Sequence, residues 1–171
     1  RALDLLSADD VQRGQVVAET VVLLNRAGRH AEAQALATVA LSEASSAEEE
    51  AAVRLRVAGV TTHTTQRRVE ENRRALQLSG LSEVTRARHL AWLAYHLMHD
   101  QLVPDYVAVN EAAAAAASTG DVEAHTMAEV TLACLECGNG YASRAIARLE
   151  SLCALTRMAP VAATHDRARH N

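Results

Sequence analysis

The feature that most constrains this chain is the spacing of its apolar residues, which recur at i, i+3, i+4 and i+7 almost throughout the 171 residues. That spacing is the period of an amphipathic α-helix, and the alternating pattern of half-buried strands does not occur. The clearest stripes are Val17/Val21/Leu24, Leu36/Val39/Ala40, Leu90/Leu93/Leu97 and Leu132/Leu135. The pattern therefore predicts an all-α fold.

The predicted helices fall into pairs. Short polar turns are centred on residues 29, 63, 100 and 139, so about 34 to 39 residues separate one turn from the next, close to the 34-residue unit of tetratricopeptide repeats. The first helices are predicted at about 11–27, 47–61, 83–98 and 122–137, and the second helices at about 31–44, 66–78, 106–118 and 141–157. The predicted pairs are thus about 11–45, 47–79, 83–118 and 122–157.

A single helical hairpin cannot bury its own apolar stripe, so neighbouring pairs are expected to stack. We therefore expect one helical-repeat domain over residues 1–171, a tetratricopeptide-like solenoid of about four helix pairs, with a plain bundle of eight helices as the alternative. Alanine makes up about a fifth of the residues and Phe is absent. Because such small side chains allow helices to approach closely, a core can form with almost no aromatic residues.

Local signals mark where helices begin and end. Ser7–Asp10 and Ser46–Glu49 have the spacing of capping boxes, and Asp121 is predicted to cap a helix just after Gly120. Residues 1–6 resemble the end of a preceding helix, and residues 165–171 the start of a fifth pair. We therefore expect the chain to be a piece of a longer protein.

Two segments carry a family resemblance. Residues 26–37, Arg-Ala-Gly-Arg-His-Ala-Glu-Ala-Gln-Ala-Leu-Ala, and residues 73–80, Arg-Arg-Ala-Leu-Gln-Leu-Ser-Gly, are similar to the tetratricopeptide-like helical-repeat region of large ATP-binding LuxR-type (maltose-activator-like) transcription regulators. The resemblance implies an ATPase domain before this region and a helix-turn-helix domain after it. This chain has no Lys, so it lacks the lysine of a phosphate-binding loop.

A cluster on the first helix of the third pair is the main candidate site. In a tetratricopeptide array the first helices line the concave groove. The turn at His99 then places four residues toward it, with Arg86 nearby: His89, Leu93, His96 and Leu97. Trp92 and Tyr95 take packing positions. Such a groove suits a small anionic or polar ligand, or an acidic peptide; the alternative is that these histidines are half-exposed and bind nothing.

Asn25 and Arg26, on the first helix of the first pair, are predicted to extend the polar wall of the same groove. A solvated helix face explains them equally well.

Neither a metal nor a cofactor is expected. His96 and His99 lack the further ligands that a zinc site needs. Cys134 and Cys137 form a Cys-x-x-Cys pattern, but no strand precedes it, and buried cysteines are the better interpretation. The spacing of the sequence does not bring together the acid and base groups that an enzyme would need.

Composition excludes further classes. The net charge of −4 argues against direct contact with nucleic acid, and no apolar stretch is long enough to span a membrane. We expect a non-enzymatic sensor module of a cytoplasmic LuxR-type regulator, which binds a small-molecule inducer or a protein partner in its groove. The alternative is a tetratricopeptide scaffold for protein docking or self-association without a small ligand, and homo-oligomer formation stays open.

Overall fold

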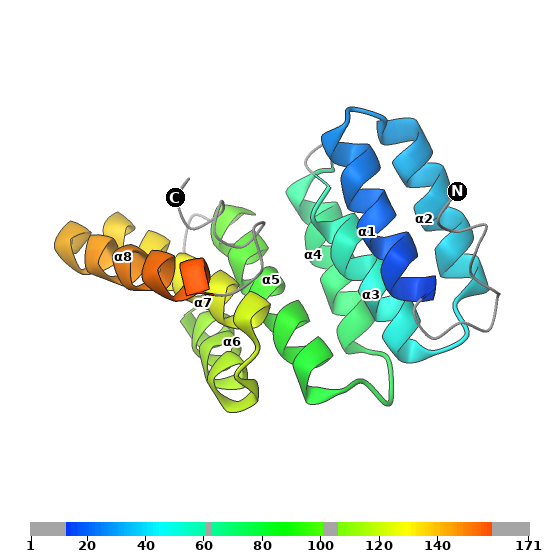
Figure 1. The fold of residues 1–171 in the computed structure, drawn as a ribbon. Coiled ribbons are helices and arrows are strands. Elements are labelled where there is room, and N and C mark those ends of the chain that lie inside the picture. The colour runs from blue at the N-terminus through cyan, green and yellow to red at the C-terminus, as the bar shows by residue number, and fades with distance from the viewer. Residues whose placement is uncertain (1–12, 61–62, 101–105, 159–171) are drawn as a thin grey trace. The chain divides into compact units, whose positions relative to one another are not determined.

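The computed structural model describes residues 13–60, 63–100 and 106–158, and these contain helices and turns but no strand (Figure 1). The described helices are α1 (Arg13–Arg26), α2 (His30–Glu43), α3 (Ala47–Ala58), α4 (Thr65–Leu76), α5 (Glu83–Asp100), α6 (Tyr106–Thr119), α7 (Val122–Gly138) and α8 (Ala142–Met158). The all-α prediction is confirmed. Each observed helix coincides with a predicted one to within a few residues.

The chain divides into two compact units, residues 1–85 and 86–171. The first unit holds α1 to α4, and the second holds nearly all of α5 together with α6 to α8. One continuous repeat domain over residues 1–171, and the solenoid arrangement within it, stay predictions.

The turns after α1 and after α7 have the same pattern of backbone hydrogen bonds. After α1, Gly28 N–H donates to Asn25 O and Arg29 N–H to Leu24 O; after α7, Gly140 N–H donates to Cys137 O and the next amide to Glu136 O. Both glycines have positive φ, +74° and +84°. This is the Schellman ending, in which glycine takes the left-handed conformation that other residues avoid.

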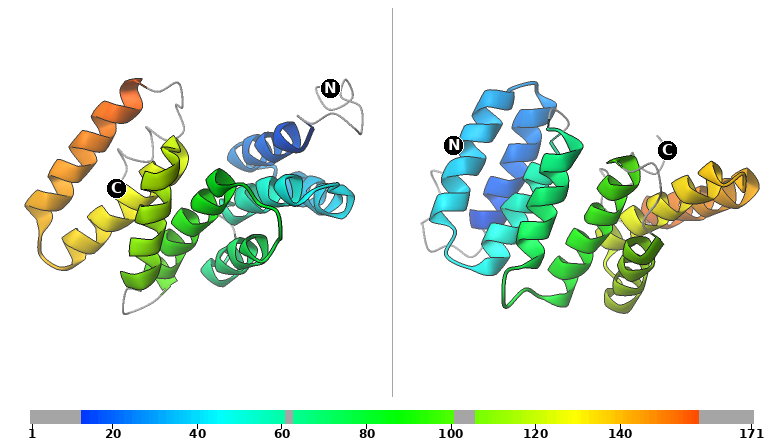
Figure 2. Two further views of the ribbon diagram at one scale, coloured as in Figure 1. Left: turned by 90° about the horizontal axis from the view of Figure 1, so that it is seen from below. Right: turned by 180° about the vertical axis from the view of Figure 1, so that it is seen from behind.

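In the first unit, α3 packs against both α1 and α2, and the three helices lie side by side in every view (Figure 2). The close approach of α1 and α3 shows at Gly14, where an added Cβ would lie 2.5 Å from Glu49 Cγ. The core cluster consists of small and β-branched residues from all three helices: Val21, Ala33, Ala37, Val53 and Val57. Alanine-lined contacts thus replace aromatic residues, as predicted.

In the second unit, α7 packs against α6 and α8. Val130 on α7 and Leu152 on α8 form a core cluster, with Tyr95 and Leu149 packed around them. The alanine run 112–117 follows the helical period, since only Ala112 and Ala116 are buried, together with Val109 one turn earlier. The rest of the run is partly or fully exposed.

The capping signals are confirmed where the structure describes them. Ser46 Oγ accepts from the Glu49 amide at 3.2 Å, and Asp121 Oδ1 accepts from the Ala124 amide at 2.9 Å. The box at Ser7–Asp10, the helix end in residues 1–6 and the fifth pair at residues 165–171 lie outside the described residues. Among the described residues, no helix is long and apolar enough to cross a bilayer.

Candidate functional site

The two histidines predicted to face a groove are buried. His89 is 0% exposed and His96 is 1% exposed. The His96 ring packs beside two aromatic rings of its own helix, with centroid distances of 5.5 Å to both Trp92 and Tyr95. Neither imidazole is therefore half-exposed or open to a ligand at the surface of this structure, and both of these expectations are wrong.

The other members of that cluster differ in exposure. Arg86 is exposed and Leu93 is half-buried. Trp92 is buried and Tyr95 is packed against the α7–α8 core, so the packing positions predicted for these two aromatic residues are confirmed.

Asn25 and Arg26 lie at the end of α1, in the first unit. Asn25 Oδ1 is 2.7 Å from His30 Nδ1, so the amide joins the helices across their turn. Arg26 is exposed. A shared groove between these residues and Arg86 stays a prediction.

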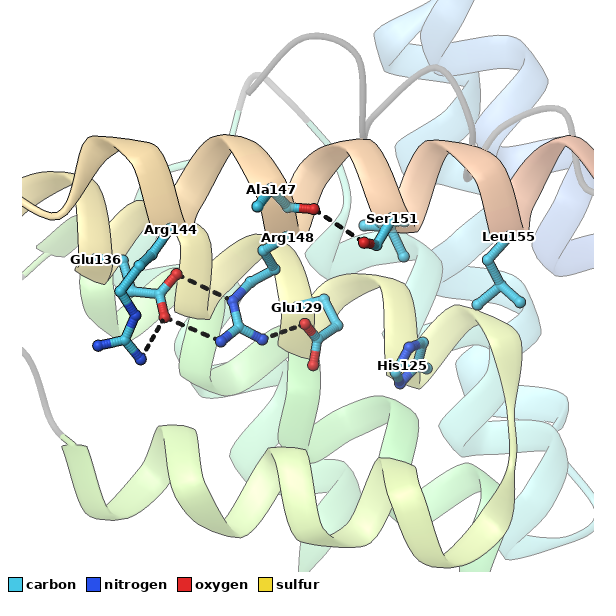
Figure 3. Close-up of a pocket in the computed structure, with 9 residues that line it drawn as sticks. His125, Glu129, Glu136, Arg144, Ala147, Arg148, Ser151 and Leu155 are labelled. Carbon is cyan, nitrogen blue, oxygen red and sulfur yellow. Dashed lines mark hydrogen bonds and ion pairs between the residues drawn. The ribbon is translucent and has the colours of Figure 1, made fainter.

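A pocket lies elsewhere, in the second unit, as a groove of about 610 Å³ between α7 and α8 (Figure 3). Each helix contributes one face, at the spacing that puts side chains above one another on a helix. The lining residues are His125, Glu129 and Glu136 from α7, and Arg144, Ala147, Arg148, Ser151, Leu152 and Leu155 from α8.

An ion-pair network occupies the part of the groove near the turn. Arg148 bonds Glu136 through two nitrogens, at 3.0 and 3.1 Å, and also bonds Glu129, as the dashed lines of Figure 3 show. The hydrogen bonds that Arg148 donates to Glu136 lower the pKa of this carboxyl group, and the hydrogen bonds that Glu136 and Glu129 accept raise the pKa of Arg148. Glu136 therefore stays charged, and both carboxylates accept hydrogen bonds from the guanidinium.

Arg144 is an exposed cation at the edge of the groove. Its side chain is 69% exposed and lies 3.4 Å from Glu136, a carboxylate that Arg148 already engages. An exposed ion pair of this kind contributes little to stability. Arg144 can thus turn toward another anion at low cost.

The far end of the groove is apolar. Leu155 is 47% exposed, beside buried Leu152 and the ring of His125. Ser151 Oγ donates to the main-chain oxygen of Ala147 at 2.9 Å, so its hydroxyl is engaged within its own helix. The groove therefore runs from a charged end to an apolar end.

Sequence reasoning missed this groove, although the chain carries a signal for it. If the sequence is folded back at Gly140, positions equally far from it face each other: Glu136 opposite Arg144, and His125 opposite Leu155. Arg148 then falls between the positions opposite the two glutamates. The predicted turn at residues 138–140 contained this register.

The cysteine prediction needs one correction. Cys134 and Cys153 are partly buried and pack against the α7–α8 core, and burial raises the pKa of Cys134. Cys137, in the last turn of α7, is exposed rather than buried. Among the described residues, no cluster of His, Cys, Asp and Glu has the arrangement of a metal site.

The chain matches no protein-family model, no curated protein and no solved structure. The residues and their geometry therefore carry the functional argument.

Proposed function

We propose that this chain is a non-enzymatic interaction module whose α7–α8 groove docks an amphipathic helix of a partner protein. The groove itself carries the proposal: two antiparallel helices line it with matching faces, and its exposed surface is polar at one end and apolar at the other. A helix lying in a groove between two helices is a common mode of recognition.

The charges select the chemistry of the partner. Arg144 is the exposed cation at one end, and Leu155 is the exposed apolar side chain eleven residues along α8. At a rise of about 1.5 Å per residue, this spacing corresponds to about 16 Å. A partner helix with an acidic residue at one end and a leucine three turns away matches both positions.

The same groove is poorly suited to catalysis or to a small substrate. Glu136 is held charged by Arg148, and the Ser151 hydroxyl bonds its own helix, so neither is poised as an acid or a nucleophile. Small-molecule sites usually bury most of their ligand. The exposed side chains at both ends of this groove favour a protein segment.

The resemblance to LuxR-type regulators supports the proposal that such a module is cytoplasmic and forms the sensor segment between an ATPase and a DNA-binding domain. Docking of a partner would regulate the neighbouring domains if it bound two arrangements of the repeat region with unequal affinity. This setting rests on the resemblance of residues 26–37 and 73–80 alone.

A labelled helical peptide tests the docking proposal. The peptide is alanine-based, with two glutamates at one end and two leucines eleven residues further along; its counterpart has arginines in place of the glutamates. We expect fluorescence anisotropy to show tighter binding of the acidic peptide to the full chain.

Two variants of equal net charge then locate the site. Arg144→Gln should weaken binding of the acidic peptide about threefold to fivefold, the scale of an exposed ion pair. Ser143 is exposed on the same helix but lies outside the groove, so Ser143→Glu should weaken binding less. Equal binding of both peptides, or equal effects of both variants, contradicts the proposal.

A further inference from the structure

A second cavity, of about 260 Å³, lies within the first unit between α1, α2 and the end of α3. Its floor is apolar and nearly inaccessible, since each of these side chains is at most 6% exposed. The floor residues are Val21, Ala33, Ala37, Val57 and Val60.

The polar lining of this cavity consists of His30, Gln34 and His63. Two donors converge on one oxygen there: Arg67 Nη2 donates to Gln34 Oε1 at 3.0 Å, and His63 Nε2 lies 3.1 Å from the same oxygen. Because Arg67 can only donate, the Gln34 amide must present its oxygen to both groups.

His63 faces an acceptor on its other side as well. Its Nδ1 lies 3.1 Å from the carbonyl oxygen of Val57. A neutral imidazole carries one N–H and satisfies only one of these two oxygens, whereas an imidazolium satisfies both. Both ring nitrogens of His63 thus face oxygen atoms, an arrangement that only an imidazolium would satisfy completely.

The surroundings of His63 oppose that protonation. Burial lowers its pKa, as do the positive charges of Arg67 and Arg68 on α4, while the Val57 carbonyl and Glu71 act in the opposite direction without overcoming them. His30, from α2, is the other titratable group on the cavity lining, and its Nδ1 lies 2.7 Å from Asn25 Oδ1. An additional negative charge near Gln34 Oε1 would favour the imidazolium.

We propose that this cavity binds a short aliphatic monocarboxylate, whose tail lies on the apolar floor and whose carboxylate takes the place of Gln34 Oε1 between Arg67 and His63. The Gln34 oxygen marks where an acceptor fits in the ligand-free protein. At about 30 Å³ for each water-sized group, the cavity holds roughly eight non-hydrogen atoms, the size of hexanoate. An amine would meet Arg67 and His63 with the wrong charge.

The test uses sodium hexanoate as the probe, with hexanol and hexylamine as ligands of the same tail. Titration calorimetry on the full chain should show that hexanoate binds at least about tenfold more tightly than either. Equal affinity for hexanoate and hexanol, or no binding of hexanoate in the millimolar range, overturns the proposal.

A variant that places a carboxylate in the cavity distinguishes binding of hexanoate at this site from nonspecific binding elsewhere on the protein. Gln34→Glu places an anion between Arg67 and His63. It should therefore raise the melting temperature of the protein and lower its affinity for hexanoate at least about tenfold. Gln66→Glu, an exposed position on α4, makes the same change in net charge and should do neither. Unchanged hexanoate affinity in Gln34→Glu refutes the site.

Binding should also take up a proton at His63. Hexanoate affinity is expected to rise as the pH falls from 8 to 6, and in His63→Gln, which cannot be protonated, this dependence should disappear. A pH profile that is flat in the original chain, or unchanged in His63→Gln, contradicts the proposed pairing.

Discussion

Replacement of Ala112 by Leu is a direct test of how this protein builds a core without large side chains. Ala112 lies on α6 at 0% exposure, in the buried stripe with Val109 and Ala116. A leucine at this position has no space, so neighbouring side chains or the helix itself must shift. Overpacking of this kind costs about 1–3 kcal/mol.

The matched control lies two residues away in the same alanine run. Ala114 is exposed, and leucine is nearly as good a helix former as alanine, so Ala114→Leu should change the free energy of unfolding by less than about 0.5 kcal/mol. Both substitutions add the same atoms to the same helix. The difference between them therefore measures packing alone.

Urea and thermal denaturation, followed by circular dichroism at the helix band, give the measurement. If residues 86–171 unfold as a unit, a loss of about 1 kcal/mol lowers the melting temperature by about 4–8 °C. Ala112→Leu should therefore melt at least about 4 °C lower than Ala114→Leu. Equal stability of the two variants would refute the view that α6 packs through its alanines.

Three further changes test local features. Gly140→Ala should cost about 1 kcal/mol in chemical denaturation because its φ is +84°, while Gly138→Ala, whose φ is not positive and which has space around it, should not destabilise. Asp121→Ala should cost about 0.5–2 kcal/mol, while Asp121→Asn, which keeps the cap, should cost less; equal losses would argue against capping. Arg148→Met should lower the free energy of unfolding at pH 7, because it removes the ion pair with Glu136. Since the pKa of Glu136 is lowered from 4.5, this loss of stability should shrink as the pH falls through the lowered pKa. A loss that does not depend on pH would contradict the ion-pair account.

The helices were predictable because their signals are local. Gly28 and Gly140 end helices through the left-handed conformation, and Ser46 and Asp121 begin them through side-chain acceptors, so each boundary depends on a few neighbouring residues. The helical period also identified Trp92 as a packing residue.

Burial of polar residues was less predictable. The period places His89, Leu93 and His96 on one face of α5, but it does not reveal what covers that face. Both imidazoles prove to be buried, which depends on tertiary packing rather than on spacing. A histidine at helical spacing is therefore weak grounds for a groove.

The two cavities depend on contacts between residues far apart in the sequence. Arg148 and Glu129 are nineteen residues apart, and Gln34 and Arg67 are thirty-three apart. The first pair follows from the register of a hairpin that the sequence does predict. The second requires knowing that His63 and Arg67 lie against Gln34 of α2, which no local signal contains.

Nuclear magnetic resonance mapping of the acidic helical peptide on the isotopically labelled chain tests the docking account most directly. The account predicts that peptide-induced shifts concentrate on the backbone amides of His125, Glu129, Arg144 and Leu155 and on the methyl groups of Leu155, and that they disappear with the arginine-bearing peptide. Shifts confined to other helices, or the same shifts with both peptides, would contradict it.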